Sequence, residues 1–206
     1  DPARWLSKAK SMLAPGGVLV PRRDVLWAAL VETPAEYEKV VGPWRNRLFD
    51  VDLSAGLSRI TNSWRKTRLA AGELLTEPVC WTALDYRELV SADVAAELSW
   101  RVERNATAHG VAIWFDAELA DGIGFTNRPG APELVYGQAF FPFPRAVEVS
   151  AGERVEKGHV LLRVDSDVKV GGDVVVRTYD LGGVVYHSVQ PKEEEENPFY
   201  NKEKLP

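Results

Sequence analysis

Cysteine is almost absent from this sequence. Cys80 is the only one among 206 residues, which excludes a disulfide framework within the chain and a zinc site built from several cysteines. None of the three histidines has a second His or Cys at metal-ligand spacing, so we expect no metal site. The neighbours Val79 and Trp81 are apolar, which favours a buried, unreactive thiol at Cys80.

Long hydrophobic runs are also missing. No apolar stretch approaches the ~20 residues that a membrane-spanning helix needs, and no signal-peptide pattern opens the chain. The net charge of −5 argues against an obligate nucleic-acid binder. We therefore expect a soluble, cytoplasmic protein with no membrane and no nucleic acid among its partners. The first residue is Asp1 rather than Met, which suggests a piece of a longer protein.

The usual catalytic loops are absent as well. No Gly-rich phosphate or cofactor loop follows a first strand, and no G-x-S-x-G nucleophile motif occurs. The G-x-G at residues 122–124 has no helix after it, so it predicts a turn between strands. The sequence on its own therefore names no catalytic centre.

What is present begins with a short α/β pattern. Apolar residues at helical spacing predict a helix over residues 2–13, which Pro15-Gly16-Gly17 ends. Val18–Val20 is predicted to be a short buried strand, and Val25–Val31 a second strand. Pro34 begins a run of good helix formers that reaches Val41.

Residues 44–71 have a different pattern, with apolar side chains among Arg and Lys. Four of them recur at i, i+4, i+7 and i+11 and would form one face of a helix: Leu53, Leu57, Ile60 and Trp64. Asp52 or Ser54 could cap it. Two interpretations remain open, a helix that faces its own core and an arm that packs on a partner.

From residue 74 onward the pattern is β. The expected strands cover residues 97–103, 111–119, 135–141, 146–149, 160–164, 174–179 and 184–188. Gly and Pro clusters separate them about every ten residues, which is typical of an antiparallel barrel or sandwich. The tail from Pro191 contains four consecutive glutamates and is expected to be a solvated end.

One segment also resembles half of a lipoyl or biotinyl carrier. Residues 149–172 read V-x-x-G-x-x-V-x-K-G-x-x-L, and Lys169 lies near the position of the modified lysine. The second half of a carrier domain is missing, and the turn lacks the usual short hairpin around the lysine. A carrier stays as an alternative, and it predicts a mass shift on Lys169.

Five segments, in order, resemble the C-terminal part of the protein arginine methyltransferases. They are MLAPGGVLVPRRDVLWAALVE (12–32), PWRNRLFDVDLS (43–54), AHGVAIWFDAEL (108–119), TNRPGAPELVYGQAFFPF (126–143) and VEVSAGERVEKG (147–158). The first resembles the last strand of a class I, S-adenosylmethionine-dependent methyltransferase domain and the first barrel strand after it. The second resembles the start of the family's dimerisation arm.

The resemblance implies a mainly β fold, an antiparallel β-barrel-like domain with a helical arm inserted into it. Residues 1–21 would be a short α/β remnant of the Rossmann-like methyltransferase domain. Residues 22–190 would be the barrel, with the arm at about 44–71, and residues 191–206 a flexible acidic tail. On this interpretation Val18–Val20 has lost the strands that it would pair with, so it is expected to be exposed or rearranged.

The resemblance also implies a substrate-binding loop. Leu134-Val135-Tyr136 stands where the family has Thr-His-Trp, while Gln138 is kept. Tyr136, Glu133 and Gln138 would line the acceptor pocket of the intact enzyme, although a plain barrel position for Tyr136 is equally open. Because Val135 can neither ionise nor hydrogen-bond through its side chain, the methyl acceptor could be a protein or a small molecule.

The arm would contact a second subunit, so a homodimer is expected. The resemblance places five large side chains at that interface: Trp44, Phe49, Leu57, Ile60 and Trp64.

In the family, the cofactor loop and the paired glutamates that hold a guanidinium lie upstream of the helix at residues 2–13. The parent would use S-adenosylmethionine, whereas this chain is expected to bind no cofactor and to carry no catalytic residue. A non-enzymatic β-domain that binds a partner is the other alternative.

Overall fold

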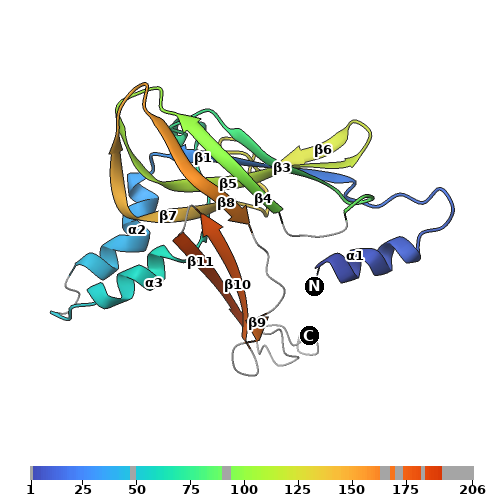
Figure 1. The fold of residues 1–206 in the computed structure, drawn as a ribbon, viewed down its shortest axis with the longest axis horizontal. Coiled ribbons are helices and arrows are strands. Elements are labelled where there is room, and N and C mark those ends of the chain that lie inside the picture. Colours follow the sequence, from blue (N-terminus) through green and yellow to red (C-terminus); the bar gives the residue numbers. More distant parts are fainter. Residues whose placement is uncertain are drawn as a thin grey trace, which may run out of the picture.

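Two antiparallel sheets make up most of the chain in the computed structural model, which describes residues 2–46, 50–89, 94–162, 168–169, 174–181 and 184–191 (Figure 1). The helices are α1 (Pro2–Ser11), α2 (Pro34–Arg45) and α3 (Leu57–Thr61), with short 3-10 turns η1 (Ser54–Gly56) and η2 (Ala71–Glu73). The strands are β1 (Arg23–Val31), β2 (Arg65–Thr67), β3 (Val79–Asp85), β4 (Val94–Arg101), β5 (Ala106–Ala120), β6 (Ile123–Thr126), β7 (Gln138–Val149), β8 (Arg154–Leu162), β9 (Val168–Lys169), β10 (Val174–Leu181) and β11 (Val184–Pro191). The expected mainly β, antiparallel character is confirmed.

The six-stranded sheet runs in the order β2-β7-β5-β1-β3, and β6 pairs with the far end of β5. The 15-residue β5 is its centre and pairs with β1 along the whole length of β1. Gly110 permits the close approach of β7, because a Cβ at this position would lie 2.2 Å from the carbonyl oxygen of Phe141.

The five-stranded sheet runs in the order β11-β10-β8-β4, and β9 pairs with β10. Within the described strands the two ladders stay separate, so the expected barrel-like domain forms two packed sheets there and no closed barrel. The expected strands at residues 135–141 and 146–149 are one continuous strand, β7, which begins only at Gln138. β11 reaches Pro191, and the expected acidic tail lies outside the described residues.

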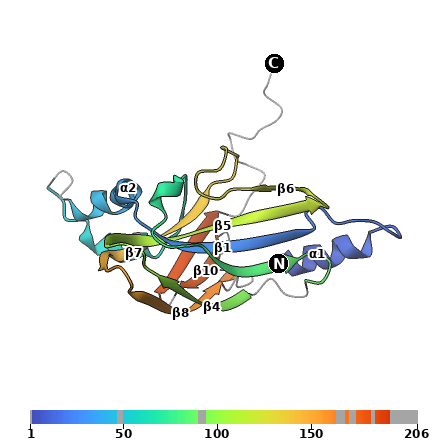
Figure 2. The same ribbon diagram turned by 90° about the horizontal axis from the view of Figure 1, so that it is seen from above.

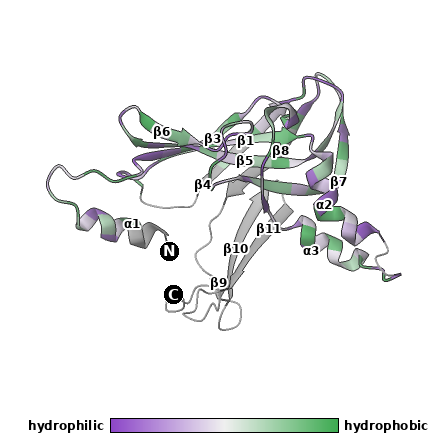
Figure 3. Cartoon of the chain, turned by 180° about the vertical axis from the view of Figure 1, so that it is seen from behind, coloured by the Kyte–Doolittle hydropathy of each residue, from purple (hydrophilic) through white to green (hydrophobic). Residues whose placement is uncertain are grey.

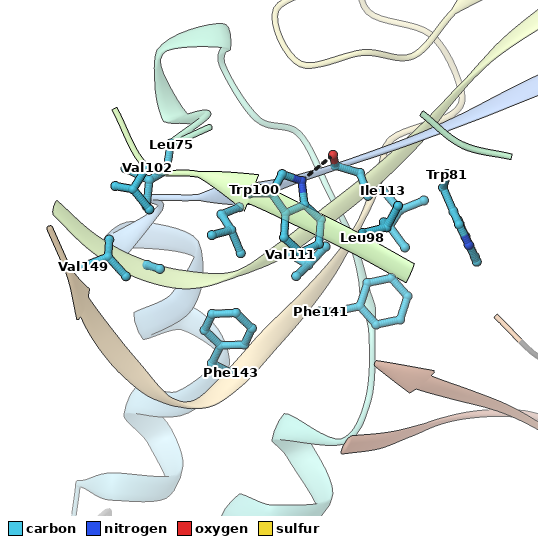
Figure 4. Close-up of a cluster of buried hydrophobic side chains, with 13 residues drawn as sticks. Leu75, Trp81, Leu98, Trp100, Val102, Val111, Ile113, Phe141, Phe143 and Val149 are labelled. Atoms are coloured by element: carbon cyan, nitrogen blue, oxygen red, sulfur yellow. Dashed lines mark hydrogen bonds between the residues drawn. The ribbon is translucent and has the colours of Figure 1, made fainter. Parts of the chain in front are cut away.

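The main core lies between the sheets (Figure 4). Trp100 is 2% exposed, and its indole Nε1–H donates a hydrogen bond to the carbonyl oxygen of Ala28 at 3.1 Å. A buried indole needs such a partner, because an unpaired N–H in an apolar interior costs about 1–3 kcal/mol. This bond ties β4 of one sheet to β1 of the other.

A second core covers the opposite face of the six-stranded sheet, where α2 packs (Figure 2). Apolar and polar residues both occur on α2 and α3 (Figure 3). Tyr37, Val40 and Val41 of α2 are buried with Trp114 of β5. Both faces of β5 are therefore covered along much of its length, which explains its long apolar run.

The expected helix in residues 44–71 is much shorter in the structure. After the end of α2, the only α-helix in the described residues 50–71 is Leu57–Thr61, and Leu53 and Trp64 fall outside it. The chain leaves the helix at Asn62 because residues 65–67 pair as β2 with the edge of β7, so sheet pairing overrides the helical spacing. Neither expected cap is used, because the N-cap of α3 is Gly56 and it has no side-chain cap bond. The Asp52 carboxylate instead accepts the amide N–H of Ser54 at 2.9 Å, at the first residue of η1.

The N-terminal segment confirms the first helix but not the strand after it. No strand forms between α1 and β1, and Met12, Val18 and Val20 are 76%, 58% and 67% exposed. The expectation of a buried strand at Val18–Val20 is therefore wrong, while the expectation that this segment is exposed or rearranged agrees with the structure. Within the described residues, the backbone N–H and C=O groups of Val18–Val20 pair with no strand.

Cys80 is exposed, so the expectation of a buried thiol is wrong. It lies on β3, at the edge of the six-stranded sheet, and neighbouring residues of a strand point to opposite faces. The core takes Trp81, which is 4% exposed, and this places Cys80 on the outer side.

Candidate functional site

The loop between β6 and β7, residues 127–137, presents two large side chains to solvent. Val135 is 74% exposed and Tyr136 is 50% exposed. The Tyr136 ring stacks on Phe125, with centroids 5.7 Å apart, and meets Phe115 edge to face at 5.6 Å. One side of Tyr136 is thus fixed by aromatic packing while the other remains accessible.

Two buried amide side chains hold the ends of this loop. Asn127 accepts the amide N–H of Phe115 at 2.8 Å and donates to the carbonyl oxygen of Gly137 at 2.6 Å. Gln138 accepts the amide N–H of Leu69 at 2.8 Å and donates to the carbonyl oxygen of Asn127 at 2.5 Å. Both side chains use their donor and acceptor ends inside the chain, so Gln138 is placed to position the loop.

Two cations of the β2 region hold the middle of the loop. Lys66 Nζ donates to the carbonyl oxygen of Val135 at 2.5 Å, and Arg68 donates to that of Leu134 at 2.7 Å. Arg68 Nε also lies 2.9 Å from a carboxylate oxygen of Glu133, whose side chain is 74% exposed. Sequence reasoning missed Arg68, Lys66 and Asn127. The local sequence pattern around these residues carries no signal that they hold this loop.

The structure brings the three predicted substrate residues to one place. Glu133, Tyr136 and Gln138 line a hollow of about 210 Å³ together with Arg68 and Arg128. A cationic acceptor would have to compete with Arg68 for Glu133. Chemically, this loop can orient a bound group, and its exposed aromatic ring can pack against one.

The predicted interface residues lie around α2, η1 and α3. Leu57 and Ile60 are half-buried against the core beneath α2, and Trp64 is half-buried against the core between the sheets. Trp44 covers Gly56 so closely that a Cβ there would lie 2.4 Å from the indole. Phe49 lies outside the described residues. Each of these described side chains is therefore partly buried in the chain's own core and partly exposed. Their role at a subunit interface stays a prediction.

A buried histidine fixes the start of α2. The amide N–H of Thr33 donates to His109 Nδ1 at 3.2 Å, and the Thr33 hydroxyl donates to Glu73 at 2.6 Å. Burial lowers the pKa of His109 below its usual 6.5, although Glu32 and Glu148 oppose this shift. The neutral ring can accept the Thr33 bond and so anchors the helix that carries the predicted interface.

Two further features of the described part bear on function. None of its helices is long and apolar enough to cross a membrane. No group of three His, Cys, Asp or Glu side chains gathers in it as metal ligands would.

Comparisons with known proteins agree on one family. A family model described as the arginine methyltransferase oligomerization subdomain matches residues 22–181. Probable protein arginine N-methyltransferase 6 of Arabidopsis thaliana is 27% identical over 124 residues, which are 57% of this chain and 27% of that protein. The chain therefore spans about a quarter of the length of this curated relative.

A solved structure supports the same fold. The Trypanosoma brucei PRMT1 enzyme–prozyme heterotetrameric complex with AdoHcy superimposes with a TM-score of 0.68 at 14% identity. The match covers 92% of this chain and 65% of that one. The segment that resembles a carrier, through Lys169, lies within the residues that the family model matches, and Lys169 pairs with Val175 inside the second sheet.

Proposed function

Because the chain belongs to the arginine methyltransferase family, we propose that it is the subunit-contact and acceptor-flanking domain of an S-adenosylmethionine-dependent methyltransferase. The observation that carries the proposal is the loop at residues 127–137. Buried amides and two cations fix its backbone while Tyr136 stays half exposed. A loop held in this way can orient an acceptor without reorganising when the acceptor binds.

Methyl transfer needs a cofactor site that we place in another part of the protein. A guanidinium is a poor nucleophile, and carboxylates must orient it and concentrate electron density on one nitrogen. Glu133, the carboxylate of this loop, is engaged by Arg68. We therefore expect no S-adenosylmethionine binding by the 206-residue chain in calorimetry, and micromolar binding would contradict this part of the proposal.

The acceptor role is tested in a protein that carries both the cofactor-binding domain and this chain. Tyr136→Ala removes the exposed ring and should raise KM by about tenfold with a smaller effect on kcat. Tyr136→Phe keeps the ring and should behave like the parent protein. Val147→Ala is the matched control, because Val147 is a 43% exposed apolar residue outside the loop. Unchanged KM and kcat in Tyr136→Ala would assign the ring only to packing against Phe115 and Phe125.

The proposal leaves two classes of methyl acceptor to be distinguished. Val135 occupies a 74% exposed position in the loop, and an aliphatic side chain there offers no ionisable group to an acceptor. We propose a methyl acceptor held by ring packing, either an arginine of a protein or a smaller molecule. A panel of arginine-rich peptides and small amines, assayed with labelled cofactor, separates the two.

The subunit-contact role rests on α2, η1 and α3. Val51 is 52% exposed, and Leu57, Ile60 and Trp44 are half-buried in this small region. Large apolar side chains that are only partly covered are typical of surfaces that bind a partner. We propose that the surface docks on a second copy of the same protein.

A further inference from the structure

A second hollow lies on the face of the six-stranded sheet that α2 covers, beyond the end of that cover. It measures about 560 Å³, within the ~300–1,000 Å³ typical of small-molecule sites. Trp27 and Trp114 are directly opposite each other on β1 and β5, and Asp116 and Thr126 are opposite each other on β5 and β6. Directly paired residues share a face, and so do residues two apart on a strand. All four side chains therefore line the same side of the sheet.

A hydrogen bond holds the carboxylate at this hollow. The indole Nε1–H of Trp27 donates to Asp116 Oδ2 at 2.8 Å, which leaves Oδ1 for another partner. Trp114 is 5% exposed and forms a buried apolar wall, whereas Trp27 is half-buried. Pro78 adds a further apolar wall.

Two opposite charges line the hollow without pairing. Within the described residues, neither Asp116 nor Arg128 has an ion-pair partner. The Arg128 backbone is fixed, since its amide N–H donates to the Thr126 hydroxyl oxygen at 3.0 Å. The other carboxylate of β5, Glu118, pairs with Arg22 instead. Asp116 and Arg128, which have no ion-pair partner in the described part of the chain, thus both border one largely apolar hollow.

We propose that this hollow binds a free α-amino acid with a large apolar side chain. The ammonium group would pair with Asp116 Oδ1, the carboxylate with the fork of Arg128, and the side chain with Trp27, Trp114 and Pro78. A zwitterion satisfies both charges, whereas a lone cation would meet Arg128 and a lone anion would meet Asp116. The site adjoins the loop hollow, because Phe125, which stacks on Tyr136, also borders this hollow and Arg128 borders both.

Three probes separate the possible ligands in titrations of the 206-residue chain. L-phenylalanine carries both charges, L-phenylalaninamide carries only the cation, and N-acetyl-L-phenylalanine carries only the anion. L-phenylalanine should bind at least about tenfold more tightly than either, as measured by the shift of the Trp27 indole N–H signal in NMR. The Trp27→Phe variant assigns that signal, and the indole of Trp44, which lies elsewhere, should not move.

Two variants test the roles of the charges. Asp116→Asn should abolish the advantage of L-phenylalanine over the N-acetyl compound, and Arg128→Gln should abolish its advantage over the amide. Glu103→Gln and Arg101→Gln change exposed charges outside the hollow and should leave all three affinities unchanged. Equal binding of the amide, which stands for a peptide N-terminus, would overturn the proposal, as would equal binding of the N-acetyl compound. A Trp27 signal that none of the probes moves would overturn it too.

Discussion

The side-chain amide of Gln138 donates to the backbone carbonyl oxygen of Asn127 at 2.5 Å, so the first residue of β7 ties down the loop that precedes it. Gln138→Ala leaves that carbonyl and the amide N–H of Leu69 without their partner in a buried site. We expect a loss of about 1–3 kcal/mol in the free energy of unfolding, measured by urea denaturation. Asn46→Ala removes an exposed amide and should cost far less. Equal losses in the two variants would refute the positioning role.

Gly110 is required by the close packing of β5 against β7. In Gly110→Ala the new Cβ would meet the carbonyl oxygen of Phe141 at 2.2 Å and the Phe140 ring at 2.7 Å. The strands must separate, and we expect destabilisation of about 2–4 kcal/mol in thermal or urea unfolding. Gly72→Ala is the matched control, because a Cβ there meets nothing within 4 Å. A Gly110→Ala protein as stable as Gly72→Ala would show that the strands lie farther apart than described.

We expect the Asp24 carboxylate to lower the stability of the chain at neutral pH. Its carboxylate is half-buried, and this burial raises its pKa, while the hydrogen bond from the Tyr86 hydroxyl at 2.6 Å opposes the shift. With the folded pKa above the unfolded value of 3.8, the folded state binds the proton more tightly, so stability falls as pH rises through this window. Asp24→Asn should therefore be more stable than the parent at pH 7, and the gain should disappear as pH falls below about 4.

The matched control for Asp24 is Asp85→Asn. Asp85 lies on the same sheet, and its carboxylate accepts the amide N–H of Arg87. This substitution should give no gain at pH 7. A less stable Asp24→Asn protein at pH 7 would contradict the account.

His109 should make stability depend on pH with the opposite sign. Burial lowers its pKa below 6.5, so the unfolded chain takes up a proton before the folded chain does. The contribution is fully present above pH 6.5 and is lost as pH falls toward the folded pKa. His109→Gln keeps an acceptor near Thr33 but cannot titrate. The difference in melting temperature between pH 7.5 and 5.5 should therefore be smaller in this variant, and an unchanged difference would exclude His109 as the cause.

Much of the sheet could be predicted from the sequence, because alternation and turn residues are local signals. Residues 111–119 read as a strand and are the middle of β5. The arm could not be predicted in the same way. Its helical spacing extends from Leu53 to Trp64, but pairing of residues 65–67 with β7 is a long-range contact that ends the helix early.

The site was only partly predictable for the same reason. Tyr136 and Glu133 were predicted as site residues because their loop resembles the family's loop. The structure places both on the exposed side of this loop. Gln138 was found too, but its burial and its two hydrogen bonds depend on residues far away in the sequence. Nothing in the local pattern around Arg68 or Asn127 indicates that they hold the same loop.

Ile60 offers the most direct test of the central claim, that this chain joins two subunits of a methyltransferase. The test uses sedimentation velocity and methyl transfer on a protein that carries the cofactor-binding domain together with this chain. The account predicts a dimer for the parent protein and for Ser58→Glu, which changes an exposed residue of α3. It predicts a monomer with methyl transfer reduced at least about tenfold for Ile60→Glu, with unchanged circular dichroism. A parent protein that is monomeric and fully active would contradict the claim.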